Sequence, residues 1–394
     1  MDRNTLLLVD EASMAGTPEL GRLLALADEH GAALLPLGDP AQHGSIGAGG
    51  ILRLLDRETD VARLNEVYRF SGPKAKEEAA ASLQIRAGNV EGLNFYIENG
   101  RVFAGTRDKV MDRVYVGWKR DIDAGKSSLM IVGTSEEVSA LNARARADRG
   151  TAGAVARDGH ALADSNTVSV GDTILTRNND RRLRMNQGKD WVQNGDLWTV
   201  TAVGPYGVMA KHHGHGGTVT LPLTYVDEHV QLGYASTSYG VQGDTVGTSG
   251  SVIDPDRSTW AEAYVDTSRA KEENRIYVVI DKPLDSSGHT DDEREQSIRG
   301  ALEQILARDI APKSATETMR AEQDATSNLA TLLPQYDHAR TAALDPKAIE
   351  RAEGAVRAAL PKELADRIID DEAWATFAAR LSTTTSPART CRPP

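Results

Sequence analysis

The sequence predicts a mixed α/β protein that carries a small β-rich insertion and ends in a helical segment. Through residues 1–166, short continuous apolar runs alternate with stretches of helical periodicity. Residues 167–232 are instead rich in Val, Thr and Gly, with turn pairs between short alternating runs. Beyond about residue 285 the chain becomes charged and Ala-rich, and its helical periodicity is broken by prolines.

The first elements predict a strand–helix–strand unit. Residues 5–9 form a continuous apolar run, which is typical of a buried parallel strand. A helical pattern over 17–29 follows, and 33–37 form a second short strand. This spacing is that of a βαβ unit and therefore of a parallel sheet. Further helices are expected over 47–56, 73–87, 108–122 and 135–149, and a further strand over 129–132.

The middle of the chain predicts a small β-barrel inserted into the α/β domain. Within 167–232, residues 192–200 are expected to form a hairpin around Asn194-Gly195. The α/β pattern returns with strands over 249–253 and 275–280. The segment from Ser382 onward has the composition of a disordered chain.

Composition restricts the possible functions. A length of 394 residues predicts two to four domains, and the net charge of −12 argues against a general electrostatic grip on DNA. A basic stretch over 177–189 is either a solvated loop or part of a locally basic channel. The single cysteine, Cys391, excludes an internal disulfide and a Cys-based zinc cluster, which fits a reducing, cytoplasmic setting. Neither a membrane span nor a secretion signal is expected.

Asp10 and Glu11 directly follow the first predicted strand. Ligands of parallel α/β sheets bind beyond the carboxyl ends of the strands. There an Asp can hold Mg²⁺, and a Glu can orient and deprotonate an attacking water. The alternative is an Asp-Glu helix cap after a buried strand. A hydrolytic site of this kind also needs a Gly-x-x-x-x-Gly-Lys-Ser/Thr loop on an earlier strand, and only nine residues precede Asp10. We therefore expect either the downstream part of an ATPase or a missing half placed elsewhere.

Further segments follow in order along the chain. They are Gly38-Asp39-Pro40-Ala41-Gln42, Leu64-Asn65-Glu66-Val67-Tyr68-Arg69, residues 234–245 with Gln242-Gly243, and residues 263–271 with Arg269. Together with Asp10-Glu11 they resemble motifs II, III, IV, V and VI of superfamily 1 helicases. The similarity covers roughly residues 5–282. It is closest to the RecD-like branch, and within it to the helicase portion of MobF (TraI/TrwC-type) conjugative relaxases.

The resemblance implies RecA-like motor domains. Residues 1–58 would be the remainder of a first domain, and 59–166 with 233–284 would form a second. Residues 167–232 would be an SH3-like barrel, and 285–394 a helical, partly disordered tail. The Tyr nucleophile and three-His metal site of a relaxase domain are not found with these motifs, and neither is Walker A.

The resemblance also implies roles for single residues. Asp10 would hold Mg²⁺, Glu11 would activate water, and Gln42 would sense the γ-phosphate. Arg69 would contact the γ-phosphate, and Arg269 would act as an arginine finger. Tyr68 would either stack on adenine or be a core aromatic. The remaining residues expected at the nucleotide are Gly38, Asp39, Gln242 and Gly243.

The function implied is that of an ATP- and Mg²⁺-dependent 5′-to-3′ DNA helicase or translocase in plasmid transfer. Its partners would be single-stranded DNA, other conjugation proteins, or a chain that supplies the missing P-loop. Two alternatives stay open: a truncated, ATPase-inactive remnant that binds DNA or a partner, and a fragment of a RecD-like repair helicase.

Two further patterns suggest sites that we do not expect to function. Gly125-Lys126-Ser127 looks like the end of a Walker A loop, but position 120 is Arg120 and the triplet precedes a strand, so a linker turn is predicted. His212, His213 and His215 are either metal ligands or part of a solvated hairpin tip.

Overall fold

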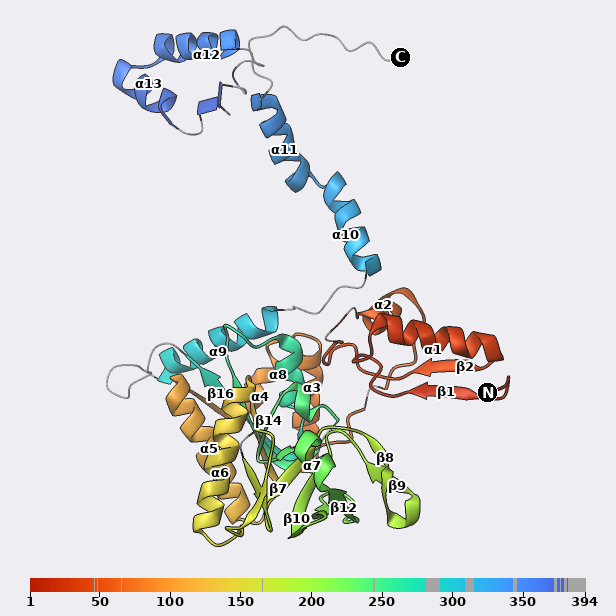
Figure 1. Cartoon of the computed structure of the whole chain (residues 1–394). Helices are drawn as coiled ribbons and strands as arrows, with labels where there is room; N and C mark the ends of the chain where they lie inside the picture. Colours follow the sequence, from red (N-terminus) through yellow and green to blue (C-terminus); the bar gives the residue numbers. More distant parts are fainter. Residues whose placement is uncertain are drawn as a thin grey trace. The chain divides into compact units, whose positions relative to one another are not determined.

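The computed structural model divides the chain into two compact units, Met1–Pro312 and Lys313–Pro394 (Figure 1). It describes residues 1–280 apart from 46, 48, 65, 165 and 244, and then residues 291–308, 315–342, 346–371, 374, 375, 377, 378 and 381. The segment from Ser382 onward, which includes Cys391 and was expected to be disordered, lies outside the described residues.

The chain begins with the predicted βαβ unit. Strand β1 (Leu6–Val9) pairs in parallel with β2 (Ala33–Pro36), and α1 (Thr17–His30) connects them. Pro18 lies in the first turn of α1, and Gly31 ends the helix in the left-handed conformation at φ 64°. Helix α2 (Ile51–Glu58) follows, four residues later than the start of the predicted pattern.

The prediction that residues 5–9 form a buried strand is wrong about the burial. The side chains of Leu6 and Leu8 are 55% and 57% exposed, and Leu35 on the same face of β2 is 43% exposed. Leu7 and Val9 on the opposite face are half-buried. A parallel sheet is normally covered on both faces, and this apolar run has the composition for that. In the described part of the chain, nothing covers the face that carries Leu6, Leu8 and Leu35.

The centre of the first unit is a five-stranded parallel sheet in the order β14-β4-β15-β16-β3. Helices α5 and α6 cover one face, where they pack against residues such as Tyr277 and Val279. The other face, with Ile276 and Val278, packs against α3, α4, α8 and α9. The parallel α/β prediction is confirmed. The strands are β3 (Val102–Gly105), β4 (Ser128–Val132), β14 (Ala235–Thr237), β15 (Val246–Ile253) and β16 (Ala270–Val279); the helices are α3 (Ala75–Arg86), α4 (Gly92–Glu98), α5 (Arg107–Asp123), α6 (Ser135–Thr151), α8 (Trp260–Asp266) and α9 (Asp291–Ala307).

Buried polar groups fix the positions of these elements. Arg275 on β16 forms an ion pair with Asp121 on α5 at 2.6 Å, and both side chains are almost fully buried. The Asn142 side chain on α6 accepts hydrogen bonds from the backbone N–H groups of Tyr234 and Ala235 at 3.0 and 2.8 Å. Asn142 therefore fixes the entry into β14.

The insertion contains a five-stranded antiparallel sheet in the order β12-β11-β10-β7-β13. The recorded pairings leave this sheet open, so closure into an SH3-like barrel stays a prediction. The prediction of a 192–200 hairpin is wrong, because β9 pairs with β8 whereas β10 pairs with β7 and β11. The Asn194-Gly195 turn passes between two sheets, with Gly195 N–H donating to Thr176 O at 2.8 Å. The elements are β5 (Gly159–Ala161), β6 (Thr167–Ser169), β7 (Thr173–Thr176), β8 (Asp180–Met185), β9 (Asp190–Val192), β10 (Leu197–Gly204), β11 (Gly207–His212), β12 (Thr218–Pro222), α7 (Leu223–His229) and β13 (Val230–Leu232).

The C-terminal region is helical, as predicted. Helix α9 belongs to the first unit, where it buries Leu302 and Ile305 in the core. In the second unit, α12 and α13 pack around Val356 and Ala365. The helices of that unit are α10 (Ala315–Ser327), α11 (Leu329–Ala342), α12 (Pro346–Ala359) and α13 (Lys362–Ile369). None of the described helices combines the length and the hydropathy that a membrane crossing requires.

Candidate functional site

The ends of β1 and β2 place two polar loops side by side. Leu37 N–H donates to Val9 O, and Ala12 N–H donates to Leu37 O, both at 2.8 Å. Asp10-Glu11 and Gly38-Asp39 therefore leave the sheet together. A Cβ added to Gly38 would lie 2.8 Å from Leu52 Cδ1 and 3.2 Å from the backbone nitrogen of Ala12, so the close approach of the loops favours glycine.

Glu11 has an unusual backbone conformation and a distant partner. Its φ is 50°, in the left-handed region, and its N–H is held by Asp10 Oδ1 at 2.9 Å. Gln242 Nε2 donates to Glu11 Oε2 at 2.9 Å from the turn before β15. Two residues that the sequence assigned to the site are thus brought together across 231 positions.

Asp39 is occupied by partners within the fold. Its carboxylate pairs with the guanidinium of Arg86 on α3 at 2.8 Å and accepts from the Tyr264 hydroxyl on α8 at 3.0 Å. Ala41 N–H also donates to Asp39 Oδ1 at 3.0 Å. Asp39 therefore anchors the 38–42 loop to the second half of the unit.

Polar atoms near this junction lack partners. Gln42 Oε1, Gln242 Oε1 and Ser13 Oγ are buried, and none has a hydrogen-bond partner in the described part of the chain. Buried polar atoms are almost always satisfied, so an unsatisfied group suggests a missing water, ion or ligand. Ser13 is a candidate site residue that sequence reasoning missed; its only signal was its place three residues after Asp10.

Arg269 is buried in the fold, with 1% of its surface exposed. Its Nε donates to Val265 O at 2.8 Å, and an Nη donates to Ser268 Oγ at 3.1 Å. Burial lowers the pKa of Arg269 to about 10, and the positive charge of Arg69 adds to this effect. Arg69 itself donates to Ser268 O at 2.5 Å, and Arg69 and Glu11 both act electrostatically on Arg269.

Tyr68 and Gly243 do not join this cluster. Tyr68 is 84% exposed and its hydroxyl bonds to Glu66, so the core-aromatic alternative is wrong. Gly243 has a φ of 90° and open space around it. A role for either residue at a nucleotide stays a prediction.

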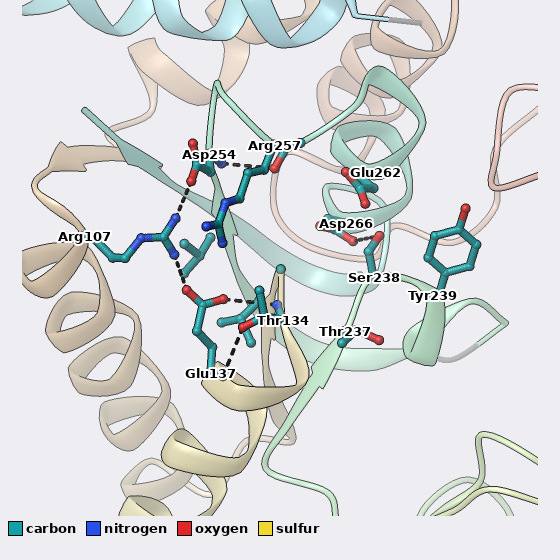
Figure 2. Close-up of a pocket in the computed structure, with 14 residues that line it drawn as sticks. Arg107, Thr134, Glu137, Thr237, Ser238, Tyr239, Asp254, Arg257, Glu262 and Asp266 are labelled. Atoms are coloured by element: carbon teal, nitrogen blue, oxygen red, sulfur yellow. Dashed lines mark hydrogen bonds and ion pairs between the residues drawn. The ribbon is translucent and has the colours of Figure 1, made fainter. Parts of the chain in front are cut away.

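A second set of residues lines a pocket of about 130 Å³ at the carboxyl ends of β4, β14 and β15 (Figure 2). Thr134 and Glu137 form a reciprocal capping box at the start of α6, and Thr259 and Glu262 do the same for α8. Figure 2 shows Arg107 between Glu137 and Asp254, to both of which it is ion-paired. Arg257 and Tyr239 also line the pocket, and both are exposed.

The two other patterns singled out in the sequence are accounted for by local structure. Gly125 lies in the turn between α5 and β4, as predicted, and Lys126 pairs with Glu272 at 3.2 Å. His213 and His215 lie in the turn between β11 and β12. Among the described residues no group of three or more His, Cys, Asp or Glu is arranged to hold a metal ion.

Comparison with known proteins places these features in a family context. Residues 1–107 match the AAA domain family. The conjugal transfer protein TraA of Agrobacterium fabrum is 28% identical over 257 residues, which are 62% of this chain and 22% of TraA. The multifunctional conjugation protein TraI of Escherichia coli is 28% identical over 171 residues, 41% of this chain and 9% of TraI. The chain is related to conjugal transfer proteins of the TraA and TraI type.

The chain spans about a fifth of the length of the TraA proteins that it matches. Among solved structures, the Bacteroides Pif1 helicase in complex with ADP-AlF3 and single-stranded DNA superimposes with a TM-score of 0.45 and 17% identity over 82% of this chain and 76% of that one. The Candida albicans Pif1 helicase gives a TM-score of 0.44 and 15% identity over 74% and 75%.

Proposed function

We propose that this chain supplies the Mg²⁺, water-activating and arginine side of the ATP site of a 5′-to-3′ DNA helicase or translocase in conjugative transfer. The observation that carries the proposal is the convergence of Glu11, Gln242, Arg69 and Arg269 from four separate segments. The guanidinium groups of Arg69 and Arg269 act on each other, and the buried Arg269 also faces the carboxyl groups of Asp266 and Glu11. Guanidinium groups bind phosphate oxygens through paired, charge-assisted hydrogen bonds, so a phosphate group suits this place.

The residues present fit Mg²⁺ and a nucleoside triphosphate. Mg²⁺ in such sites is held by one or two carboxylates together with substrate phosphates and water, so Asp10 alone meets the protein's share. Gln42 Oε1 and Ser13 Oγ are buried and unsatisfied, which suits groups that meet a ligand or its ordered water. Bound ATP–Mg²⁺ would supply the phosphoryl group to be transferred.

The chain's own residues would then act as follows. Glu11 would orient a water molecule and accept its proton, held in place by the Gln242 amide. Arg69 and Arg269 would neutralise negative charge on the transferred group, an effect that is worth ~10³-fold or more in related enzymes. Arg269 would exchange its weak 3.4 Å bond to Val241 O for the phosphate.

The uncovered face of β1 and β2 supports a further part of this proposal. Leu6, Leu8 and Leu35 form an apolar surface that a further α/β segment would bury. Such a segment, in the same polypeptide or in a second one, would also carry the phosphate-binding loop that the 394 residues do not contain.

The basic ribbon β8–β9 is the surface that best suits single-stranded DNA. Arg181, Arg182, Arg184 and Lys189 are exposed there, and the Arg181 guanidinium lies 5.0 Å from the Trp191 ring centre. Phosphates bind arginine and lysine, and bases stack on aromatic rings. Residues in this ribbon belong to the basic stretch whose role the sequence left open.

Nucleotide titration tests the proposal. A fluorescent ATP analogue should bind the full chain in a Mg²⁺-dependent manner, and Asp10→Asn should remove the Mg²⁺ dependence. Asp28→Asn, an exposed carboxylate on α1, is the matched control and should bind like the wild type. Binding of oligo-dT with no nucleotide binding at any Mg²⁺ concentration would favour the second candidate, a DNA-binding remnant.

A further inference from the structure

His43 follows Gln42 directly and is not among the residues that the sequence assigned to the site. Its side chain is buried, with 2% exposed. Its ring contacts a segment 195 positions later in the chain: Nε2 lies 2.8 Å from Ser238 Oγ. The loop that carries Gln42 is therefore tied to the segment that follows β14.

A second hydrogen bond links Ser238 to Asp266. The Ser238 hydroxyl donates to Asp266 Oδ1 at 2.5 Å. A hydroxyl has one proton, so Ser238 must accept from His43, which places the proton of the neutral imidazole on Nε2. All three side chains are buried, so this chain of hydrogen bonds is shielded from water.

The chain of hydrogen bonds ends three residues before Arg269. Asp266 is the last residue of α8, and Arg269 bonds back to the same turn through Val265 O and Ser268 Oγ. A displacement of Asp266 therefore displaces the backbone that holds the Arg269 guanidinium.

His43 also reaches the pocket of Figure 2. Its ring stacks on Tyr239 with the centroids 3.9 Å apart and the planes 16° apart. Tyr239 is 41% exposed and lines the pocket, on the far side of Ser238 from Thr134 (Figure 2). An exposed tyrosine ring at such a place can stack on a nucleic-acid base.

The geometry does not suit a serine nucleophile. In a hydrolytic triad the carboxylate orients the histidine, whereas Asp266 here accepts from the serine itself. The arrangement suits a mechanical link between two loops.

We propose that His43 is a positioning residue that couples the Gln42 loop to Arg269 and to the Tyr239 ring, so that nucleotide and single-stranded DNA influence each other's binding. This inference rests on the proposed function. His43 touches neither ligand and acts through Ser238, Asp266 and Tyr239.

The test is a binding cycle on the full chain. The affinity for fluorescent oligo-dT is measured with and without AMP-PNP–Mg²⁺, and the ratio is the coupling factor; a factor of about tenfold is typical of coupled sites. His43→Phe keeps a ring for stacking but removes the N–H, and His43→Gln keeps an N–H but removes the ring. Both should bring the factor to within about twofold of one while each separate affinity changes less than about threefold.

His30→Phe, on the surface of α1, is the matched control and should keep the wild-type coupling. Wild-type coupling in both His43 variants would overturn the inference. If the wild type binds no nucleotide, the proposed function fails, and hydrogen exchange without ligand tests His43 by itself. Ser238→Ala should then speed exchange of the amides at 42–45 in the wild type and have no further effect in His43→Phe. An unchanged rate at 42–45 would also overturn the inference.

Discussion

Gln242 Nε2 donates a 2.9 Å hydrogen bond to Glu11 Oε2, and this bond joins the end of β1 to the turn before β15. Glu11 is held at a φ of 50°, a conformation that costs a side-chain-bearing residue about 1 kcal/mol or more. Strain of this kind persists only where the surroundings hold it, and the Gln242 amide is one of the groups that do so. The carboxylate that we assign to water activation is therefore aimed by a residue from the other half of the unit.

The Glu11–Gln242 contact predicts that a negative charge at position 242 will slow phosphate release. Gln242→Glu would place a second carboxylate beside Glu11, and the two would repel each other. We expect DNA-stimulated phosphate release to fall about tenfold or more, since a 1.4 kcal/mol change is tenfold. Gln231→Glu, exposed on β13, is the control and should behave like the wild type. Unchanged phosphate release in Gln242→Glu would contradict the assignment.

His43 and Asp266 should contribute to the pH dependence of the free energy of unfolding in opposite directions. Burial lowers the pKa of His43 to about 4 and raises that of Asp266 to about 7. Above pH 4 the folded state thus holds a proton on Asp266 that the unfolded state has lost, whereas below pH 6.5 the unfolded state takes up a proton on His43 that the folded state refuses. The two effects oppose each other in the wild type.

Single variants should reveal each effect. In His43→Phe the free energy of unfolding should decrease as pH rises from about 4 to 7, and in Asp266→Asn it should decrease as pH falls from 6.5 to about 4. The expected size is about 3 kcal/mol in each direction. Urea unfolding across this range measures both profiles. Parallel profiles in the two variants would show that these groups do not titrate as described.

Breaking the buried ion pair between α5 and β16 should destabilise the first unit more than breaking an exposed pair does. Asp121→Asn removes the buried carboxylate from the Arg275 guanidinium and leaves only the part-exposed Glu273, and losing a buried charge partner typically costs about 3–5 kcal/mol. Arg63→Met removes one partner of the exposed pair with Asp56 and should cost about 1 kcal/mol or less. Chemical denaturation compares the two, and equal costs would contradict the burial of the first pair.

A polar substitution on the exposed apolar face of β1 and β2 should change the free energy of unfolding very little. Leu8→Ser alters a side chain that is 57% exposed, so the free energy of unfolding should change by about 0.5 kcal/mol or less. Solubility should rise because an exposed apolar patch is reduced. Val278→Ser, on a buried position of β16, is the contrasting variant and should unfold far more easily. A large loss of stability in Leu8→Ser would show that this face is covered.

The sequence predicted the parallel α/β core because its strands are continuous apolar runs and its turns carry recognisable signals. The capping boxes at Thr134 and Thr259 have a spacing that fixes where α6 and α8 begin. The exposure of Leu6 and Leu8 could not be predicted, because the burial of a strand residue depends on which segment packs against its face of the sheet. Strand pairing in the insertion failed for a similar reason: Asn194-Gly195 is a hairpin signal, but the long-range pairing of β10 with β7 outweighs it.

In the candidate site, too, the sequence predicted which residues take part but not the long-range contacts that position them. Asp10, Glu11, Gln242 and Arg269 could be chosen from the order of the segments, and Glu11 and Gln242 do meet. The burial of Arg269, the capture of Asp39 by Arg86 and Tyr264, and the link from His43 to Asp266 depend on contacts between segments far apart in the chain. No local pattern contains that information.

Phosphate release by the full chain, combined with a polypeptide that carries the phosphate-binding loop, tests the central claim most directly. It is measured at saturating ATP–Mg²⁺, with and without single-stranded DNA. The account predicts hydrolysis that DNA stimulates, that Glu11→Gln reduces about 100-fold or more, and that Glu19→Gln on the exposed side of α1 leaves unchanged. Equal rates in Glu11→Gln and the wild type, or an absence of hydrolysis by a completed site that binds ATP–Mg²⁺, would contradict the claim that this polypeptide carries the water-activating half of an ATP site.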